Sequence, residues 1–135
     1  VINYREEDVA ERVLEITGGR GADRIVEVEF GGNLDATQRM IAEGGTIAAY
    51  ASGAVKEPVL PFYPLMFRNV RLHMLLVYLL DPARRREGEA EITRWLEAGA
   101  LSHAVAESFP LSGTARAHEA VEAGDRLGTV VVAID

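Results

Sequence analysis

The stretch RIVEVEFGGNLDATQRMIAEGGTIAAY, residues 24–50, decides the fold class of this chain. Residues 24–30 are rich in β-branched side chains and are typical of a short buried strand, which Gly31-Gly32 ends. A helix follows up to Gly44-Gly45, and residues 46–50 supply a second strand. Alternating strands and helices with short, glycine-marked connections predict a parallel sheet flanked by helices.

The helix between these two strands has an apolar side that includes Leu34, Met40 and Ile41. Either Asn33 or Asp35 can cap its amino terminus, because both side chains accept hydrogen bonds from the unpaired N–H groups of a first helical turn. Both caps are compatible with the sequence pattern.

The chain before residue 24 predicts a strand end and a helix. Residues 1–4, Val-Ile-Asn-Tyr, read as a strand already in progress. Residues 9–16 carry apolar side chains at helical spacing, with Asp8 as the expected cap and Glu11 as its partner three residues later. Gly18-Gly19 closes this amphipathic helix.

The chain after residue 50 begins with an irregular connection, since three of the five prolines lie within residues 52–64. A near-continuous apolar run follows at residues 70–80. The remaining pattern predicts, in order, a helix at 84–98 stopped by Gly99, a strand at 104–108, a helix capped by Ser112 and ending at Gly124, and a strand at 129–134.

Composition excludes several classes of protein. With 135 residues and 48% hydrophobic content, the chain can bury a real core. Its longest apolar stretch, residues 72–80, is far shorter than the roughly 20 residues of a membrane-spanning helix. A net charge of -7 opposes binding to nucleic acid and to anionic lipid surfaces. The absence of cysteine excludes disulfides and cysteine-ligated zinc within this chain, and we expect a cytoplasmic protein.

The order and spacing of several short motifs resemble the zeta-crystallin-like quinone oxidoreductases of the medium-chain dehydrogenase/reductase superfamily. The resemblance covers the whole chain but less than half of such an enzyme. The motifs are Val1-Ile2-Asn3-Tyr4, Ile16-Thr17-Gly18-Gly19-Arg20-Gly21-Ala22-Asp23, Glu27 followed by Asn33-Leu34, Gly44-Gly45-Thr46-Ile47 leading to Ser52-Gly53, and Ala117-His118-Glu119-Ala120 with Gly128-Thr129-Val130.

This resemblance implies an α/β fold. It implies a partial Rossmann-type doubly wound parallel sheet, made of the later strands, in residues 1–99. Residues 100–135 would form a strand-helix-strand segment that returns to the catalytic domain. In the strand order 3-2-1-4-5-6, Val1 and Ile2 would have no neighbouring strand within the chain, so we expect them to be poorly ordered or paired with a partner chain.

The resemblance also implies cofactor-binding residues at the carboxyl ends of the strands. Tyr4 is expected beside the adenosine phosphate, the alternative being a surface tyrosine. Asn33 is either a cofactor ligand or an ordinary helix cap. Ala51 stands where the family often has glycine. The full expected set is Tyr4, Asn33, Tyr50, Ala51, Ser52, Gly53, Leu75, Leu76 and Val77.

Other polar residues are weaker candidates for chemistry. Arg126 could reach a phosphate. The three histidines, His73, His103 and His118, lack the spacing of metal ligands and are expected to be structural. Glu27 and Glu29 alternate on the expected strand, so they would face opposite sides and could not act as an acid–base pair there. No general acid or base is nominated.

The function implied by the resemblance is hydride transfer from NADPH to a quinone or an activated enone or aldehyde, without zinc. The 135 residues alone are expected to be inactive. One alternative is a relative of the zinc-dependent alcohol dehydrogenases, with its zinc ligands outside this chain. Another is a non-catalytic module for nucleotide binding or dimerisation, since the Val70–Val77 strand is suited to pairing with its copy in a homodimer.

Overall fold

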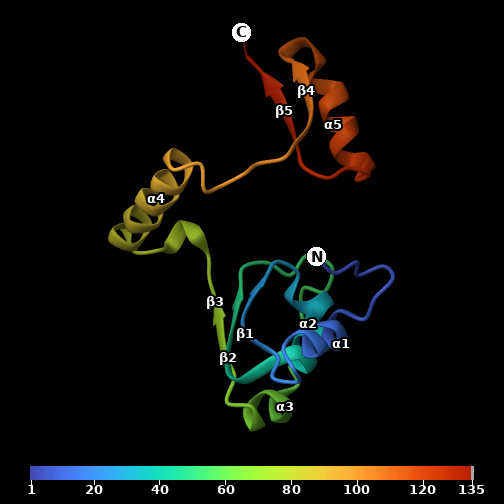
Figure 1. Ribbon diagram of the computed structural model, residues 1–135, viewed down its shortest axis with the longest axis vertical. Coiled ribbons are helices and arrows are strands. Elements are labelled where there is room, and N and C mark those ends of the chain that lie inside the picture. The colour runs from blue at the N-terminus through green and yellow to red at the C-terminus, as the bar shows by residue number, and fades with distance from the viewer. Residues whose placement is uncertain (135) are drawn as a thin grey trace. The chain divides into compact units, whose positions relative to one another are not determined.

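The computed structural model describes residues 1–134 and divides into two compact units, residues 1–81 and the residues from Pro82 onward (Figure 1). The predicted α/β class is confirmed, because both units combine helices with parallel strands. Among the described residues, no helix is long and apolar enough to span a membrane.

The first unit contains a three-stranded parallel sheet. Its strands are β1 (Ala22–Glu27), β2 (Ile41–Ala49) and β3 (Arg71–Met74), in the order β1-β2-β3. Ile47 of β2 pairs with Ile25 on one side and Leu72 on the other. The sequence prediction of parallel neighbours is therefore confirmed, and the three strands end at a common edge.

The helices of the first unit are α1 (Val9–Ile16), α2 (Phe30–Met40) and α3 (Phe62–Phe67), with a short 3-10 turn, η1, at Val77–Leu79. The predicted cap of α1 is confirmed, because the Asp8 carboxylate accepts a 3.0 Å hydrogen bond from the Glu11 N–H. Gly18 and Gly19 follow this helix with positive φ angles of 62° and 84°, which glycine adopts without strain.

The start of α2 differs from the prediction. The helix begins at Phe30, and its cap is Glu29 instead of Asn33 or Asp35. The predicted strand accordingly ends at Glu27 and does not reach Phe30. Gly31 and Gly32 form the first helical turn, because the Glu29 carboxylate and the following loop supply the acceptors that its N–H groups need.

Other boundaries also differ. Residues 1–4 form no strand in the structure, in keeping with the absence of a neighbouring strand for them. β2 begins at Ile41, five residues early, because Ile41 pairs with Ala22 across an irregularity in the ladder. β3 is confined to residues 71–74. Pro64 lies in the first turn of α3, where the backbone N–H groups have no partner within the helix, so proline is tolerated.

The core of the first unit forms where α2 packs on β1 and β2. Ile41 and Ile47 are fully buried, and burial of one such side chain contributes about 1.5–3 kcal/mol. The buried cluster consists of Ile25, Phe30, Leu34, Ile41, Ile47, Ala49 and Leu65.

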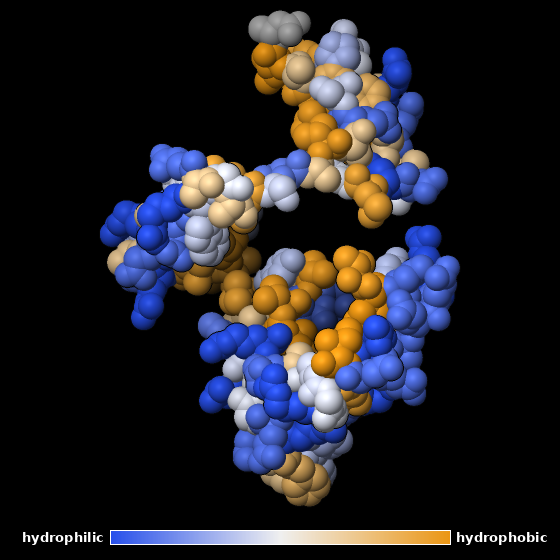
Figure 2. All heavy atoms as spheres, in the orientation of Figure 1, coloured by the Kyte–Doolittle hydropathy of each residue, from blue (hydrophilic) through white to orange (hydrophobic). Residues whose placement is uncertain are grey.

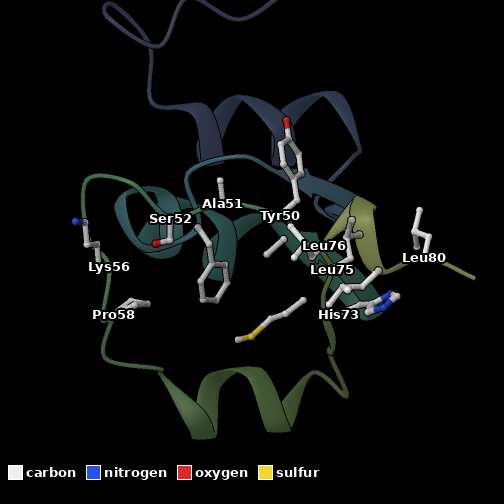
Figure 3. Close-up of a pocket in the computed structure, with 13 residues that line it drawn as sticks. Tyr50, Ala51, Ser52, Lys56, Pro58, His73, Leu75, Leu76 and Leu80 are labelled. Atoms are coloured by element: carbon white, nitrogen blue, oxygen red, sulfur yellow. The ribbon is translucent and has the colours of Figure 1, made fainter.

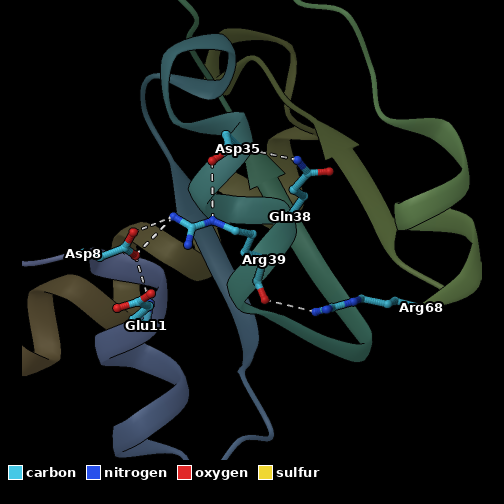
Figure 4. A network of polar contacts seen from close by, with 6 residues as sticks. All are labelled: Asp8, Glu11, Asp35, Gln38, Arg39 and Arg68. Carbon is cyan, nitrogen blue, oxygen red and sulfur yellow. Dashed lines mark hydrogen bonds and ion pairs between the residues drawn. The ribbon is translucent and has the colours of Figure 1, made fainter.

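A polar network joins α1 to α2 (Figure 4). Arg39, near the end of α2, donates to both oxygens of Asp8 at 3.1 and 2.9 Å and lies 3.4 Å from the Asp35 carboxylate. Arg68 donates to the backbone carbonyl of Arg39 at 3.2 Å. This network links the amino end of α1 to the carboxyl end of α2.

The second unit contains α4 (Pro82–Glu97), β4 (Val105–Pro110), the short turn η2 (Leu111–Gly113), α5 (Thr114–Ala123) and β5 (Thr129–Ala133). β4 and β5 pair in parallel, with α5 packed against them. The two units separate at Asp81, whereas the sequence places a domain boundary after residue 99.

The ends of α5 agree only in part with the prediction. Ser112 lies in η2 and does not cap the helix, whose cap is Gly113 without a side-chain hydrogen bond. Gly124 ends the helix as expected, with a φ of 67°. Arg126 donates to the carbonyls of Ala120 and Val121 at 2.9 and 2.8 Å, so its guanidinium stabilises the end of α5.

Candidate cofactor-binding site

A pocket of about 600 Å³ lies where β2 and β3 end, beside the start of α2 (Figure 3). Its volume is within the range of small-molecule sites. The lining residues come from the ends of β2 and β3, the loop after β2 and the segment after β3. They are Phe30, Ala49, Tyr50, Ala51, Ser52, Lys56, Pro58, His73, Met74, Leu75, Leu76, Leu79 and Leu80.

The pocket is mainly apolar. Its few polar side chains include Ser52, Lys56 and His73, and the ammonium group of Lys56 points away from the pocket in Figure 3. In the space-filling view, hydrophobic side chains gather on the first unit near the end of β3 (Figure 2). Such a surface suits a flat, partly apolar ligand and disfavours a highly charged one.

The structure brings together five of the nine predicted cofactor residues. Tyr50, Ala51, Ser52, Leu75 and Leu76 line the pocket. The other four predicted residues, Tyr4, Asn33, Gly53 and Val77, do not line it.

Sequence reasoning missed further lining residues. Phe30 was assigned to a strand, although it begins α2. His73, whose spacing predicts a structural role, is exposed on β3 and is one of the lining residues. Met74 and Lys56 also line the pocket, although the predicted set does not include them. The signal that could have identified Met74 is its place at the end of a parallel strand.

The loop after β2 is tied to the first turn of α2. The Phe30 N–H donates to the Ala51 carbonyl at 3.0 Å, and the Gly31 N–H donates to the Ser52 hydroxyl oxygen at 2.9 Å. The Ser52 hydroxyl in turn donates to the Val55 carbonyl at 2.5 Å. Its proton is therefore used within the loop, and Ser52 can offer a ligand only an acceptor.

The close contact between this loop and α2 requires glycine at residue 31. A Cβ atom there would lie 2.2 Å from the Val55 carbonyl oxygen and 2.8 Å from the Ser52 hydroxyl. Neither distance is compatible with a side chain unless the loop moves away. Gly31 thus allows the loop to approach the helix.

Glu29 connects the same two segments from the other side. Its carboxylate accepts hydrogen bonds from the N–H groups of Gly53 at 2.7 Å and Ala54 at 3.0 Å, with longer contacts to Val55 and Gly32. The Ala54 hydrogen bond, followed by those of the neighbouring amides, lowers the pKa of Glu29 against the opposing effect of burial. The carboxylate therefore remains charged over a wide pH range.

Glu27 and Asn33 form a separate, partly buried cluster. Glu27 is 4% exposed and accepts hydrogen bonds from the Glu29 N–H at 2.7 Å, the Asn33 amide at 2.9 Å and the Thr37 hydroxyl at 3.2 Å. The Asn33 side chain thus binds the end of β1 through one N–H, and its second N–H and its carbonyl oxygen are left for a ligand. The Glu27 carboxylate therefore binds Asn33 and Thr37, whereas the Glu29 carboxylate binds the loop after β2. Glu29 lies beyond the end of β1 and not on the strand predicted for residues 24–30.

The remaining predicted residues lie outside the pocket. Tyr4 is 71% exposed in a turn, and its ring lies 5.8 Å from the Arg5 guanidinium carbon. Val77 is the first residue of η1.

The described residues do not form a metal site. Within residues 1–134, no three His, Asp or Glu side chains come together in a way that could hold an ion.

The ends of β2 and β3 have the features of a site for one end of a dinucleotide. Open parallel sheets bind nucleotides at this edge, and small residues at Ala49 and Ala51 allow a ligand to approach the backbone.

Comparisons with known proteins agree with this geometry. The family model described as zinc-binding dehydrogenase matches residues 1–132. The 2-haloacrylate reductase of a Burkholderia species is 32% identical over 97% of this chain, and quinone oxidoreductase 1 of Escherichia coli K12 is 32% identical over 90%. The chain spans only 40% and 39% of the lengths of these two relatives.

The same fold occurs in a mycobacterial protein whose structure was solved in complex with NADPH. It superposes with a TM-score of 0.76 at 25% identity, over 99% of this chain and 42% of the other. The two curated relatives and this mycobacterial protein are therefore all considerably longer than the 135 residues of this chain.

Proposed function

Because the chain belongs to the zinc-binding dehydrogenase family, within the medium-chain dehydrogenase/reductase superfamily, we propose that it forms part of the NADPH site of an oxidoreductase. The observation that carries this proposal is the pocket at the ends of β2 and β3, which gathers Tyr50, Ala51, Ser52, Leu75 and Leu76. Dinucleotides bind at this edge of doubly wound sheets.

The residues of the pocket would hold the uncharged nicotinamide end of the cofactor. Ala51 and Leu75 would offer backbone groups, and Ser52 an acceptor oxygen. Phe30 and Met74 would exclude water from one face of the bound ring. NADPH, when bound, supplies the hydride. The proposal also includes four cofactor contacts outside the pocket, at Tyr4, Asn33, Gly53 and Val77.

The proposed substrate is a quinone or an activated enone or aldehyde, reduced without zinc. The names of the two curated relatives, a quinone oxidoreductase and a 2-haloacrylate reductase, support a conjugated acceptor. The alternative is a zinc-dependent alcohol dehydrogenase, which the description of the matching family favours. Its zinc ligands would have to come from outside residues 1–134.

The organisation of the protein is also part of the proposal. Residues 1–99 would belong to the nucleotide-binding domain, and residues 100–135 to the catalytic domain. β3 would pair with its copy along the segment Val70–Val77 in a homodimer, because it is an edge strand of the described sheet. We further propose a cytoplasmic protein that binds neither nucleic acid nor membranes.

The decisive experiment measures oxidation of NADPH by the complete natural protein, with a naphthoquinone and an α,β-unsaturated ketone as acceptors. We expect turnover with NADPH, slower turnover with NADH, and no loss of activity after dialysis against a zinc chelator. Activity that disappears with the chelator and returns with zinc would favour the alcohol dehydrogenase alternative. No binding of either cofactor would refute the proposal.

A further inference from the structure

The carboxylate of Glu29 occupies a cluster of backbone amides in the loop that carries Ala51 and Ser52. It accepts hydrogen bonds from Gly53 and Ala54 at 2.7 and 3.0 Å, and Val55 lies at 3.5 Å. Adjacent N–H groups that point at one place form a concavity suited to an anion. Here the anion is a side chain of the protein itself.

These contacts come from a residue 24 to 26 positions earlier in the chain. Glu29 also caps α2, where its carboxylate lies 3.4 Å from the Gly32 nitrogen. One carboxylate therefore joins the beginning of the helix to the loop that follows β2. Without it, the loop amides would lose a charged acceptor, and charge-assisted hydrogen bonds are stronger than neutral ones.

The other anchors between the loop and α2 lie at the beginning of the loop, and the Ser52 hydroxyl also donates to the Val55 carbonyl within the loop. Ala51 accepts the Phe30 N–H at 3.0 Å and Ser52 accepts the Gly31 N–H at 2.9 Å. Beyond Ser52, the hydrogen bonds that connect residues 53–55 to α2 or its cap go to Glu29. Glu29 thus supplies the side-chain contact that ties Gly53 and Ala54 to the start of α2.

We propose that Glu29 is a positioning residue for the cofactor, which it does not touch, because it holds residues 53–55, the segment that connects the pocket-lining residues Ser52 and Lys56. This inference rests on the proposed binding of NADPH. Since the protein's own carboxylate fills the amide cluster, these N–H groups are not offered to a cofactor phosphate. This occupancy agrees with the proposed placement of the uncharged nicotinamide end at the pocket.

The test compares Glu29→Gln with Glu57→Gln in the complete natural protein. Both variants remove one negative charge, and Glu57 is an exposed residue four positions beyond Gly53. We expect Glu29→Gln to raise the KM for NADPH about tenfold, because apparent affinity falls with the fraction of protein in the binding-competent conformation. The kcat should change less than about twofold, and Glu57→Gln should leave both constants unchanged.

A second measurement needs no activity. Hydrogen exchange of the peptide that covers residues 51–55, in the absence of NADPH, should become faster in Glu29→Gln and stay unchanged in Glu57→Gln. If Glu29→Gln does not fold, Ala54→Pro removes one donor from the other side of the same contact and should raise KM in the same way.

The outcomes separate this inference from the proposed function. Normal NADPH binding by the wild type, with an unchanged KM in Glu29→Gln, would overturn the inference alone. A fall in kcat at constant KM would also overturn it, because that result assigns Glu29 to the chemical step. Failure of the wild type to bind NADPH would overturn the proposed function and the inference together.

Discussion

The Asn33 amide donates a 2.9 Å hydrogen bond to the carboxyl group of Glu27, a residue that is 4% exposed at the end of β1. This contact fixes the first turn of α2 against the strand that precedes it. Asn33 therefore stabilises the edge of the sheet where the pocket forms.

Replacement of Asn33 by Ala should lower the free energy of unfolding by about 1.5–3 kcal/mol, the contribution of a hydrogen bond to a charged group. Urea denaturation measures this change. Gln38→Ala is the control, because the Gln38 amide contacts only exposed Asp35, at 3.2 Å, on the same helix. Equal unfolding free energies for Asn33→Ala and the wild type would show that the Asn33–Glu27 contact does not stabilise the fold.

Gly31→Ala should weaken NADPH binding about tenfold, because the new Cβ would lie 2.2 Å from the Val55 carbonyl oxygen and displace the loop. Titration of the complete protein with NADPH provides the dissociation constant. Gly88→Ala is the matched control, since a Cβ on that exposed position of α4 meets no atom within 4 Å. Equal affinity in both variants would contradict the role assigned to Gly31.

The order of the loop should depend on pH through Glu29. Its folded-state pKa is lowered from 4.5, chiefly by the Ala54 N–H. A lowered pKa means that the charged carboxylate stabilises the folded loop above pH 4.5, and that this stabilisation is lost as pH falls through the folded-state pKa. The groups that lower it are the backbone amides of Ala54, Gly53, Val55 and Gly32.

Hydrogen exchange at Gly53 and Ala54, corrected for the intrinsic effect of pH, checks this prediction. Protection in the wild type should decrease in acid, whereas Glu29→Gln should show low protection throughout. A wild-type loop whose protection is independent of pH down to global acid unfolding would be inconsistent with it.

Asp8→Ala should lower the Tm, because it removes both the cap of α1 and the partner of Arg39. The pKa of Asp8 is lowered, first by its hydrogen bond with Arg39 and then by the Glu11 N–H. Its contribution is therefore present above its unfolded pKa and lost as the pH falls through the folded one. Asp35→Ala should lower the Tm less, since Asp35 does not cap α1. Thermal melts of both variants provide the comparison, and equal Tm values would argue against the capping role.

The proposed dimer can be tested at β3. The Leu75 N–H donates to Ala49 of β2 at 2.9 Å, so the alternating N–H of Met74 points to the open edge of the strand. Met74→Pro should then change the mass measured by light scattering from dimer to monomer, whereas Met74→Leu should remain dimeric. A wild-type protein that is monomeric at high concentration would refute the dimer.

Much of the fold could be predicted from the sequence because the signals are local. The apolar spacing of residues 9–16, with Asp8 before them, specifies α1 and its cap. The strand, helix and strand between residues 24 and 50 specify parallel neighbours, since a helical crossover brings the second strand back in the same direction. The family predicted from short motifs in order along the chain is confirmed by the family model that matches residues 1–132.

The candidate site could be predicted only in part. Tyr50, Ala51 and Ser52 follow a recognisable strand, so their place at the carboxyl edge is visible in the sequence. Asn33 was expected to act as a cap or a ligand, but its partner Glu27 was not recognised. A buried polar contact between a strand and a helix leaves no periodic signal.

The sequence by itself determined the alternation of elements, the parallel sheet and the family, because hydrophobic periodicity and turn residues act over a few neighbouring positions. The tertiary structure alone decided where α2 begins and how the pocket wall is held. Glu29 takes part in both, because it caps α2 through the Gly32 N–H and also accepts the N–H groups of Gly53 and Ala54, 24 and 25 residues away. Such contacts exist only after the sheet has brought the two segments together, so no local pattern of residues encodes them.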